Sequence, residues 1–64
     1  MTRNLKIYFN RARDWSRLYA MFGEFHEKTW NAEIKWGDAY AILTEEELEM
    51  LDKYYERKDE KEND

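Results

Sequence analysis

The 64-residue sequence contains no cysteine and no proline, and it has only two glycines. The absence of cysteine excludes disulfides and metal sites built from thiolates. The absence of proline lets the chain run in regular elements with few forced breaks. A chain of this size buries only about 60% of the surface that its unfolded form exposes. We therefore expect stability to come from a well-packed core, a second copy or a protein partner.

Long apolar runs are also absent. No stretch approaches the roughly 20 apolar residues of a membrane-spanning helix. Residues 1–10 lack the apolar segment and the small-residue cleavage site of a signal peptide. With no cysteine and no export signal, we expect a cytoplasmic protein that has no membrane partner.

Aromatic residues are abundant, with three tryptophans, five tyrosines and three phenylalanines making up 17% of the chain. Such side chains can build a small core, and they also anchor interfaces. The net charge is −4, but residues 1–23 carry +4 and residues 24–64 carry −8. This asymmetry indicates interactions with charged partners and carries no information about the fold.

The first half of the chain shows two different periods. Residues 4–10 alternate between the two faces of an extended chain, and the alternation of β-branched and aromatic side chains predicts a strand. Beyond it, apolar residues recur at helical spacing, and the predicted helix ends at Gly23 or near Lys28. The predicted face of this helix comprises Trp15, Leu18, Tyr19, Phe22, Phe25 and His26.

Residues 29–44 alternate again and predict a β-hairpin. Gly37 and Asp38 would form its two-residue turn, with glycine in the first position of a type II′ turn. Pairing around that turn places Trp36 opposite Ala39, so that large and small residues face each other on one apolar side.

A second helix is predicted after the hairpin. Thr44 and Glu47 have the spacing of a capping box, and Leu48, Leu51 and Tyr55 would form the buried stripe. The resulting order is β-α-β-β-α, an α+β fold with a three-stranded sheet and two helices packed on one face. We expect a single domain over residues 1–58 and a charged, disordered tail over residues 59–64.

Catalytic groups are scarce. His26 is the only histidine and Ser16 the only serine, so the sequence offers very few residues for a catalytic nucleophile paired with a base. His26 begins an HExxH-like stretch, but Trp30 stands where the second histidine would be. Glycine-rich phosphate loops are excluded by the two isolated glycines. We expect no enzymatic activity, no cofactor and no metal.

Four acidic residues of the second predicted helix fall on one side of it, which we call the acidic stripe. They are spaced four, three and four residues apart, so their carboxylates follow one another at roughly 5–6 Å per turn. Such a spacing is close to that of backbone phosphates and favours mimicry of nucleic acid. The alternative is an ordinary solvated helix face. The stripe comprises Glu45, Glu49, Asp52 and Glu56.

Two other surfaces are open to interpretation. Arg11, Arg13 and Arg17 form a basic region that a nucleic-acid-binding regulator would use, although the acidic chain as a whole disfavours direct binding to nucleic acid. The open face of the predicted sheet favours, in turn, a homodimeric structural or assembly protein. That face would present Tyr8, Glu33, Lys35, Tyr40 and Ile42.

The leading prediction is a non-enzymatic protein-binding module. A short, acidic, aromatic-rich and cysteine-free chain resembles, in composition, the small phage-encoded inhibitors of host enzymes or defence systems. This resemblance implies inhibition of a nucleic-acid-handling or anti-phage defence protein. We expect Trp36 and Tyr40, near the predicted turn, to contact that protein together with the acidic stripe.

Overall fold

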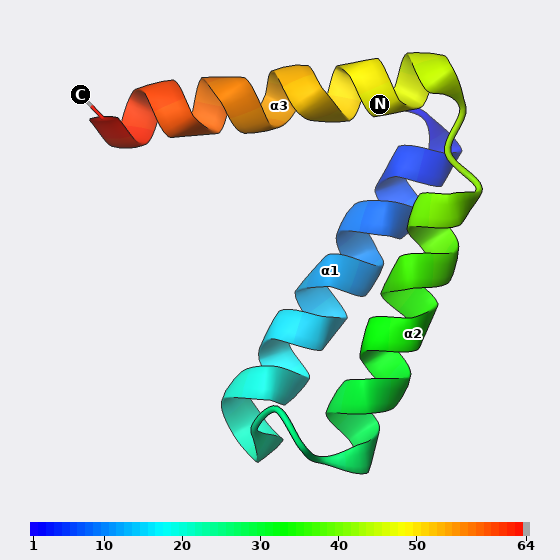
Figure 1. Cartoon of the computed structure of the whole chain (residues 1–64), viewed down its shortest axis with the longest axis vertical. Helices are drawn as coiled ribbons and strands as arrows, with labels where there is room; N and C mark the ends of the chain where they lie inside the picture. Colours follow the sequence, from blue (N-terminus) through cyan, green and yellow to red (C-terminus); the bar gives the residue numbers. More distant parts are fainter. Residues whose placement is uncertain (64) are drawn as a thin grey trace.

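The computed structural model consists of helices (Figure 1). It describes the backbone of residues 1–63 and the side chains of residues 1–57, so the predicted tail over 59–64 lies outside the residues described in full. The helices are α1 (Arg3–Phe22), α2 (Glu27–Ala41) and α3 (Glu45–Asn63).

The α+β prediction is wrong, because residues 1–63 contain no strand. The order β-α-β-β-α and the three-stranded sheet with helices on one face are replaced by a helical hairpin, α1 and α2, followed by α3. The open sheet face does not exist, and a homodimer formed through it is excluded. Of its five expected residues, Tyr8 is buried and the others lie on α2 or just after it.

Helix α1 includes the segment that was expected to be a strand. Leu5 and Tyr8 are spaced three apart and both are buried, and the pattern continues without a break into the predicted helical face. The side chain of Thr2 caps the helix by accepting a hydrogen bond from the Leu5 N–H at 3.2 Å. Gly23 ends it with φ of 85°, a left-handed conformation that favours glycine. The alternating apolar residues within 4–10 therefore belong to one broad apolar face of α1.

Helix α2 replaces the predicted β-hairpin. Its residues facing α1 follow the three-four spacing of a helix, and most of them are small, which allows the two helices to approach closely. Gly37 and Asp38 lie inside the helix, and the φ of Gly37 is not positive, so no turn forms there. The residues on this face are Thr29, Ala32, Trp36 and Ala39, and Leu43 adds to the core just beyond the end of the helix.

Aromatic rings fill the space between the two hairpin helices. The ring of Trp36 lies 5.3 Å from that of Trp15 and 6.0 Å from that of Tyr8. Nearer the loop, the buried Thr29 hydroxyl donates a hydrogen bond to the Leu18 carbonyl at 3.2 Å. These contacts tie α1 to α2 along most of their length.

Helix α3 contacts the N-terminal end of α1 and then leaves the hairpin at a wide angle (Figure 1). Its Leu51 joins the core formed by Leu5 and Tyr8, and the Tyr8 and Tyr55 hydroxyls lie 3.1 Å apart. The molecule is flat, with extents of 32 × 31 × 14 Å. Its radius of gyration is 13.1 Å, whereas a compact chain of this length would have about 10.7 Å.

The capping box predicted at the start of α3 is confirmed. The Glu47 N–H donates to the Thr44 hydroxyl at 3.2 Å, and the Thr44 N–H donates to the Glu47 carboxylate at 3.0 Å. The same carboxylate accepts hydrogen bonds from the side chains of Thr2 and Asn4 at the start of α1. Glu47 therefore joins the N-terminal ends of two helices.

Candidate binding surfaces

The structure places the two predicted aromatic contacts on α2, one turn apart. Trp36 is half-buried in the hairpin and its indole Nε1 is buried with no hydrogen-bond partner among the described residues. Tyr40 is 51% exposed, and its ring lies 6.1 Å from that of Tyr8. Together with Glu33 and Gly37 they line one shallow hollow on the hairpin. Most of Trp36 thus serves the core, and Tyr40 is the accessible member of the pair.

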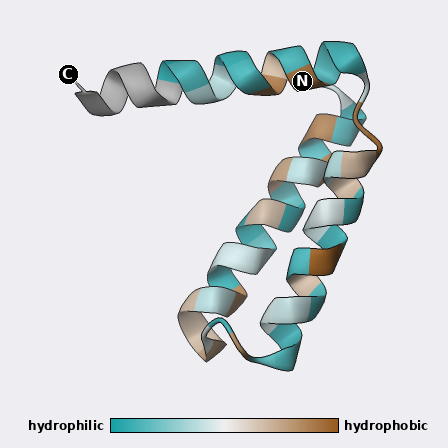
Figure 2. Cartoon of the chain, viewed as in Figure 1, coloured by the Kyte–Doolittle hydropathy of each residue, from teal (hydrophilic) through white to brown (hydrophobic). Residues whose placement is uncertain are grey.

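The acidic stripe lies along the exposed side of α3. All four carboxylate residues are exposed. At 100° per residue they lie about 100–160° around the helix axis from the buried Leu51, so they face away from the contact with α1. Hydrophilic residues predominate along the described part of this helix (Figure 2). The stripe and the Trp36–Tyr40 hollow are therefore on different helices and form two surfaces.

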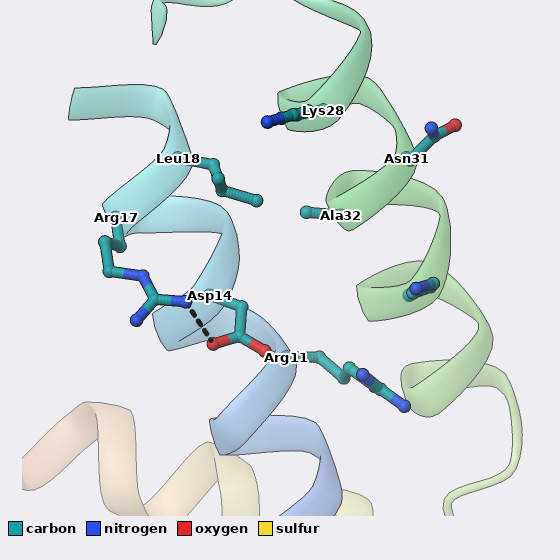
Figure 3. Close-up of a pocket in the computed structure, with 8 residues that line it drawn as sticks. Arg11, Asp14, Arg17, Leu18, Lys28, Asn31 and Ala32 are labelled. Atoms are coloured by element: carbon teal, nitrogen blue, oxygen red, sulfur yellow. Dashed lines mark ion pairs between the residues drawn. The ribbon is translucent and has the colours of Figure 1, made fainter. Parts of the chain in front are cut away.

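A basic groove between α1 and α2 was only partly visible in the sequence. Arg11 and Arg17 of α1 and Lys28 and Lys35 of α2 line one cleft of about 300 Å³. Figure 3 shows Arg11 extending toward α2, whereas Arg17 lies beside Asp14 on the side of α1 away from α2. The basic region predicted from the sequence included the two arginines, but the two lysines were assigned to other elements. Once residues 27–41 are known to form a helix, Lys28 and Lys35 are expected on one side of it, because residues seven apart lie on the same side of a helix.

The groove carries more positive than negative charge. Its one acidic residue is Asp14, whose carboxylate lies 3.6 Å from the Arg17 guanidinium. The Lys28 ammonium sits 5.1 Å from the centre of the Phe22 ring, a cation–π contact. Among the described side chains, neither Arg11 nor Lys35 forms an ion pair. The groove is therefore suited to an anionic group.

Apolar side chains gather around the loop between α1 and α2, and we call this group the tip cluster. Phe25 is 95% exposed, and Met21 and Trp30 are each 65% exposed. Phe22 is also exposed, and its ring stacks on the imidazole of His26 at 4.4 Å. Four large apolar residues thus fall within ten positions of the chain, at the end of the hairpin farthest from α3 (Figure 1).

His26 has a defined role at the start of α2. Its Nδ1 accepts a hydrogen bond from the Lys28 N–H at 3.1 Å, so the imidazole caps the helix. Sequence reasoning placed His26 on the face of the preceding helix, and the structure corrects that position. The Nδ1 atom of this exposed imidazole is therefore occupied by the backbone of its own helix.

Among the described residues, no group of three or more histidine, aspartate or glutamate side chains is placed to hold a metal ion. No described helix is long and apolar enough to cross a membrane. No family model, no curated protein and no solved structure matches this chain.

Proposed function

We propose that this chain is a non-enzymatic protein-binding module that contacts its partner through the tip cluster. The observation that carries the proposal is the exposure of Phe25, at 95% of its surface, among three other exposed apolar side chains. Single exposed apolar residues are common on protein surfaces, but a group of them is typical of an interaction site. A polar residue would fit the loop equally well, so the fold does not explain Phe25.

The hairpin fixes the backbone at both ends of the loop that carries the tip cluster. Gly23 ends α1 and His26 caps α2, so the loop between them is short and has defined ends. A preorganised surface loses little conformational entropy when it binds. Burial of one large apolar side chain contributes about 1.5–3 kcal/mol, so Phe25 and Trp30 together provide an anchor of the kind that dominates protein interfaces.

Affinity capture from a lysate with matched variants tests this proposal. The tip variant carries Phe25→Gln and Trp30→Gln, and the control carries Ile42→Gln and Met50→Gln, which replace apolar residues that are exposed elsewhere. We expect one protein to be retained in stoichiometric amount by the wild type and the control and to be lost by the tip variant. Equal retention by the tip variant would exclude the cluster as the contact surface.

The acidic stripe supports a second, finer candidate function, inhibition of a nucleic-acid-handling or anti-phage defence protein by mimicry. Its four carboxylates are exposed on one side of a straight helix and face away from the hairpin. They succeed one another by about 4.5–6 Å along the axis, and a row of this kind can occupy a groove that binds phosphates. The surface is free of the core contacts that α3 makes through Leu51.

Charge reversal distinguishes mimicry from the tip contact. The stripe variant carries lysine at all four acidic positions. The control carries lysine at the same number of exposed acids outside α3, namely Glu24, Glu27, Glu33 and Asp38. Mimicry predicts that a nucleic-acid-binding partner is lost by the stripe variant, retained by the control and displaced by DNA or RNA. Retention by the stripe variant rules mimicry out.

A further inference from the structure

We propose that the basic groove of the hairpin receives the acidic stripe of α3 from a second copy of the chain. The two copies would form a reciprocal dimer in which each contributes one groove and one stripe. This inference goes beyond the proposed function, because the tip cluster uses neither the groove nor the stripe; mimicry would use the stripe only in a chain released from the dimer. It assigns the groove an anionic occupant, a helix with carboxylates at regular spacing.

The shape of the chain supports a second copy. The surface of the chain measures 5559 Å², whereas a compact monomer of 8.0 kDa exposes roughly 4,450 Å². The chain therefore exposes more surface than a compact chain of its mass, and a standard interface hides roughly 800 Å² on each partner. Small chains without disulfides or metals often gain stability by association. The flat shape, with α3 extended from the hairpin, leaves this surface available to a second copy (Figure 1).

The two charged surfaces match in spacing. Lys28 and Lys35 are seven residues apart on α2, which separates them by about 10.5 Å along the axis. Glu49 and Glu56 are also seven residues apart on α3 and have the same separation of about 10.5 Å. A stripe lying along the groove can therefore place a carboxylate near each lysine. Arg11, which reaches across toward α2, would contact the same stripe (Figure 3).

The stripe and the groove of one chain do not meet. Helix α3 is fixed to the N-terminal end of α1 by Leu51 and Glu47, and this contact turns the stripe outward. The one ion pair among the described side chains, between Arg17 and Asp14, lies within α1. A second copy of the chain is present wherever the protein is present, and it carries the acidic stripe that the groove would bind. A two-fold arrangement forms the same contact twice.

The charges also predict how the dimer responds to salt. Several cations in one cleft repel each other, and the carboxylates of the second copy would relieve that repulsion. Exposed charges are screened over about 10 Å at 0.1 M salt. We therefore expect the proportion of dimer to fall as the salt concentration rises.

Sedimentation equilibrium with a charge exchange tests the inference. The groove variant carries Lys28→Glu and Lys35→Glu. A two-site stripe variant carries only Glu49→Lys and Glu56→Lys. Each alone brings like charges together, and we expect its dimer to be at least about 100-fold weaker. In a mixture, both contacts of the mixed dimer again join opposite charges, so we expect dimers to reappear. Far-UV circular dichroism shows that each variant folds.

Matched controls keep the charge changes and move them to other sites. Arg3→Glu with Lys6→Glu, and Glu24→Lys with Glu33→Lys, should leave the wild-type dimer intact, with twice the 8.0 kDa mass of the monomer. A wild type that is monomeric at low salt overturns the inference, as does a mixture that stays monomeric. Either result leaves the proposed binding through the tip cluster standing, because the capture experiment that tests it changes different residues. Dimers that survive both reversals would locate the interface elsewhere and also overturn it.

Discussion

The hydroxyl of Thr2 donates a hydrogen bond to the carboxylate of Glu47, across 45 positions of sequence. Glu47 also accepts from the Asn4 side chain at 3.3 Å and from the Thr44 N–H at 3.0 Å. These hydrogen bonds, the one from Thr2 first, lower the pKa of the Glu47 carboxyl to about 2. The position of α3, and hence the direction of the acidic stripe, depends on this carboxylate together with the packing of Leu51.

Acid should weaken the fold through Glu47. A carboxyl whose pKa is lower in the folded than in the unfolded state stabilises the fold above its unfolded value, 4.5. That stability is lost as the pH falls from about 5 through about 2. Thermal unfolding followed by circular dichroism should show a melting temperature that falls over this range. Glu47→Gln should flatten the dependence, while Glu46→Gln, an exposed neighbour, should leave it unchanged. An unchanged slope in Glu47→Gln would contradict the assignment.

The two glycines should respond to alanine in opposite ways. Gly37 lies inside α2, and a Cβ there would meet nothing within 4 Å. Gly37→Ala should therefore stabilise the chain by about 0.5–1 kcal/mol, because alanine favours the helix. Gly23 has φ of 85° and ψ of 175°, a region essentially limited to glycine, so Gly23→Ala should destabilise by about 1–3 kcal/mol. Urea unfolding measures both. A destabilising Gly37→Ala would argue against a helix at that position.

Removal of Leu51 should weaken the attachment of α3. This side chain is 4% exposed and packs against the core of the hairpin. Leu51→Ala should reduce the free energy of unfolding by about 2–5 kcal/mol. Met50, its exposed neighbour, provides the control, and Met50→Ala should change stability by about 0.5 kcal/mol or less. Similar effects of the two substitutions would mean that α3 does not pack through Leu51.

Tyr55 should release its proton only at strongly alkaline pH. Burial, followed by the hydrogen bond with Tyr8, raises its pKa from 10.0 to about 12. Because the folded state holds this proton more tightly than the unfolded state, the associated stability is present below pH 10 and is lost as the pH rises toward 12. Absorbance at alkaline pH should show a late step near pH 12 that belongs to Tyr55. This late step should disappear in Tyr55→Phe and persist in Tyr19→Phe.

The start of α3 and the end of α1 were easier to predict than the type of the first and third segments. The Thr44–Glu47 capping box and the glycine that ends α1 are local signals, since they depend on residues within one turn. Residues 4–10 and 29–44 fit period two and helical spacing equally well over short stretches. The choice between them depended on packing between α1 and α2, in which Ala32 and Ala39 allow close approach.

The candidate surfaces were predicted to different degrees. The acidic stripe could be read from spacing within one helix, and its one-sided arrangement follows directly. The basic groove joins residues from two helices, such as Arg11 and Lys35, so it could not be identified before the hairpin was known. Phe25 was assigned to a helix face, and its exposure became evident only when α1 ended at Gly23.

Photo-cross-linking from the tip of the hairpin tests the central claim most directly. A benzoyl-phenylalanine in place of Phe25 keeps an aromatic ring at the proposed contact, and the same residue in place of Ile42 provides an exposed control site. We predict a discrete cross-linked product with one protein from position 25 and none from position 42. The absence of a product at position 25, or the same product from both positions, would contradict binding through the tip cluster.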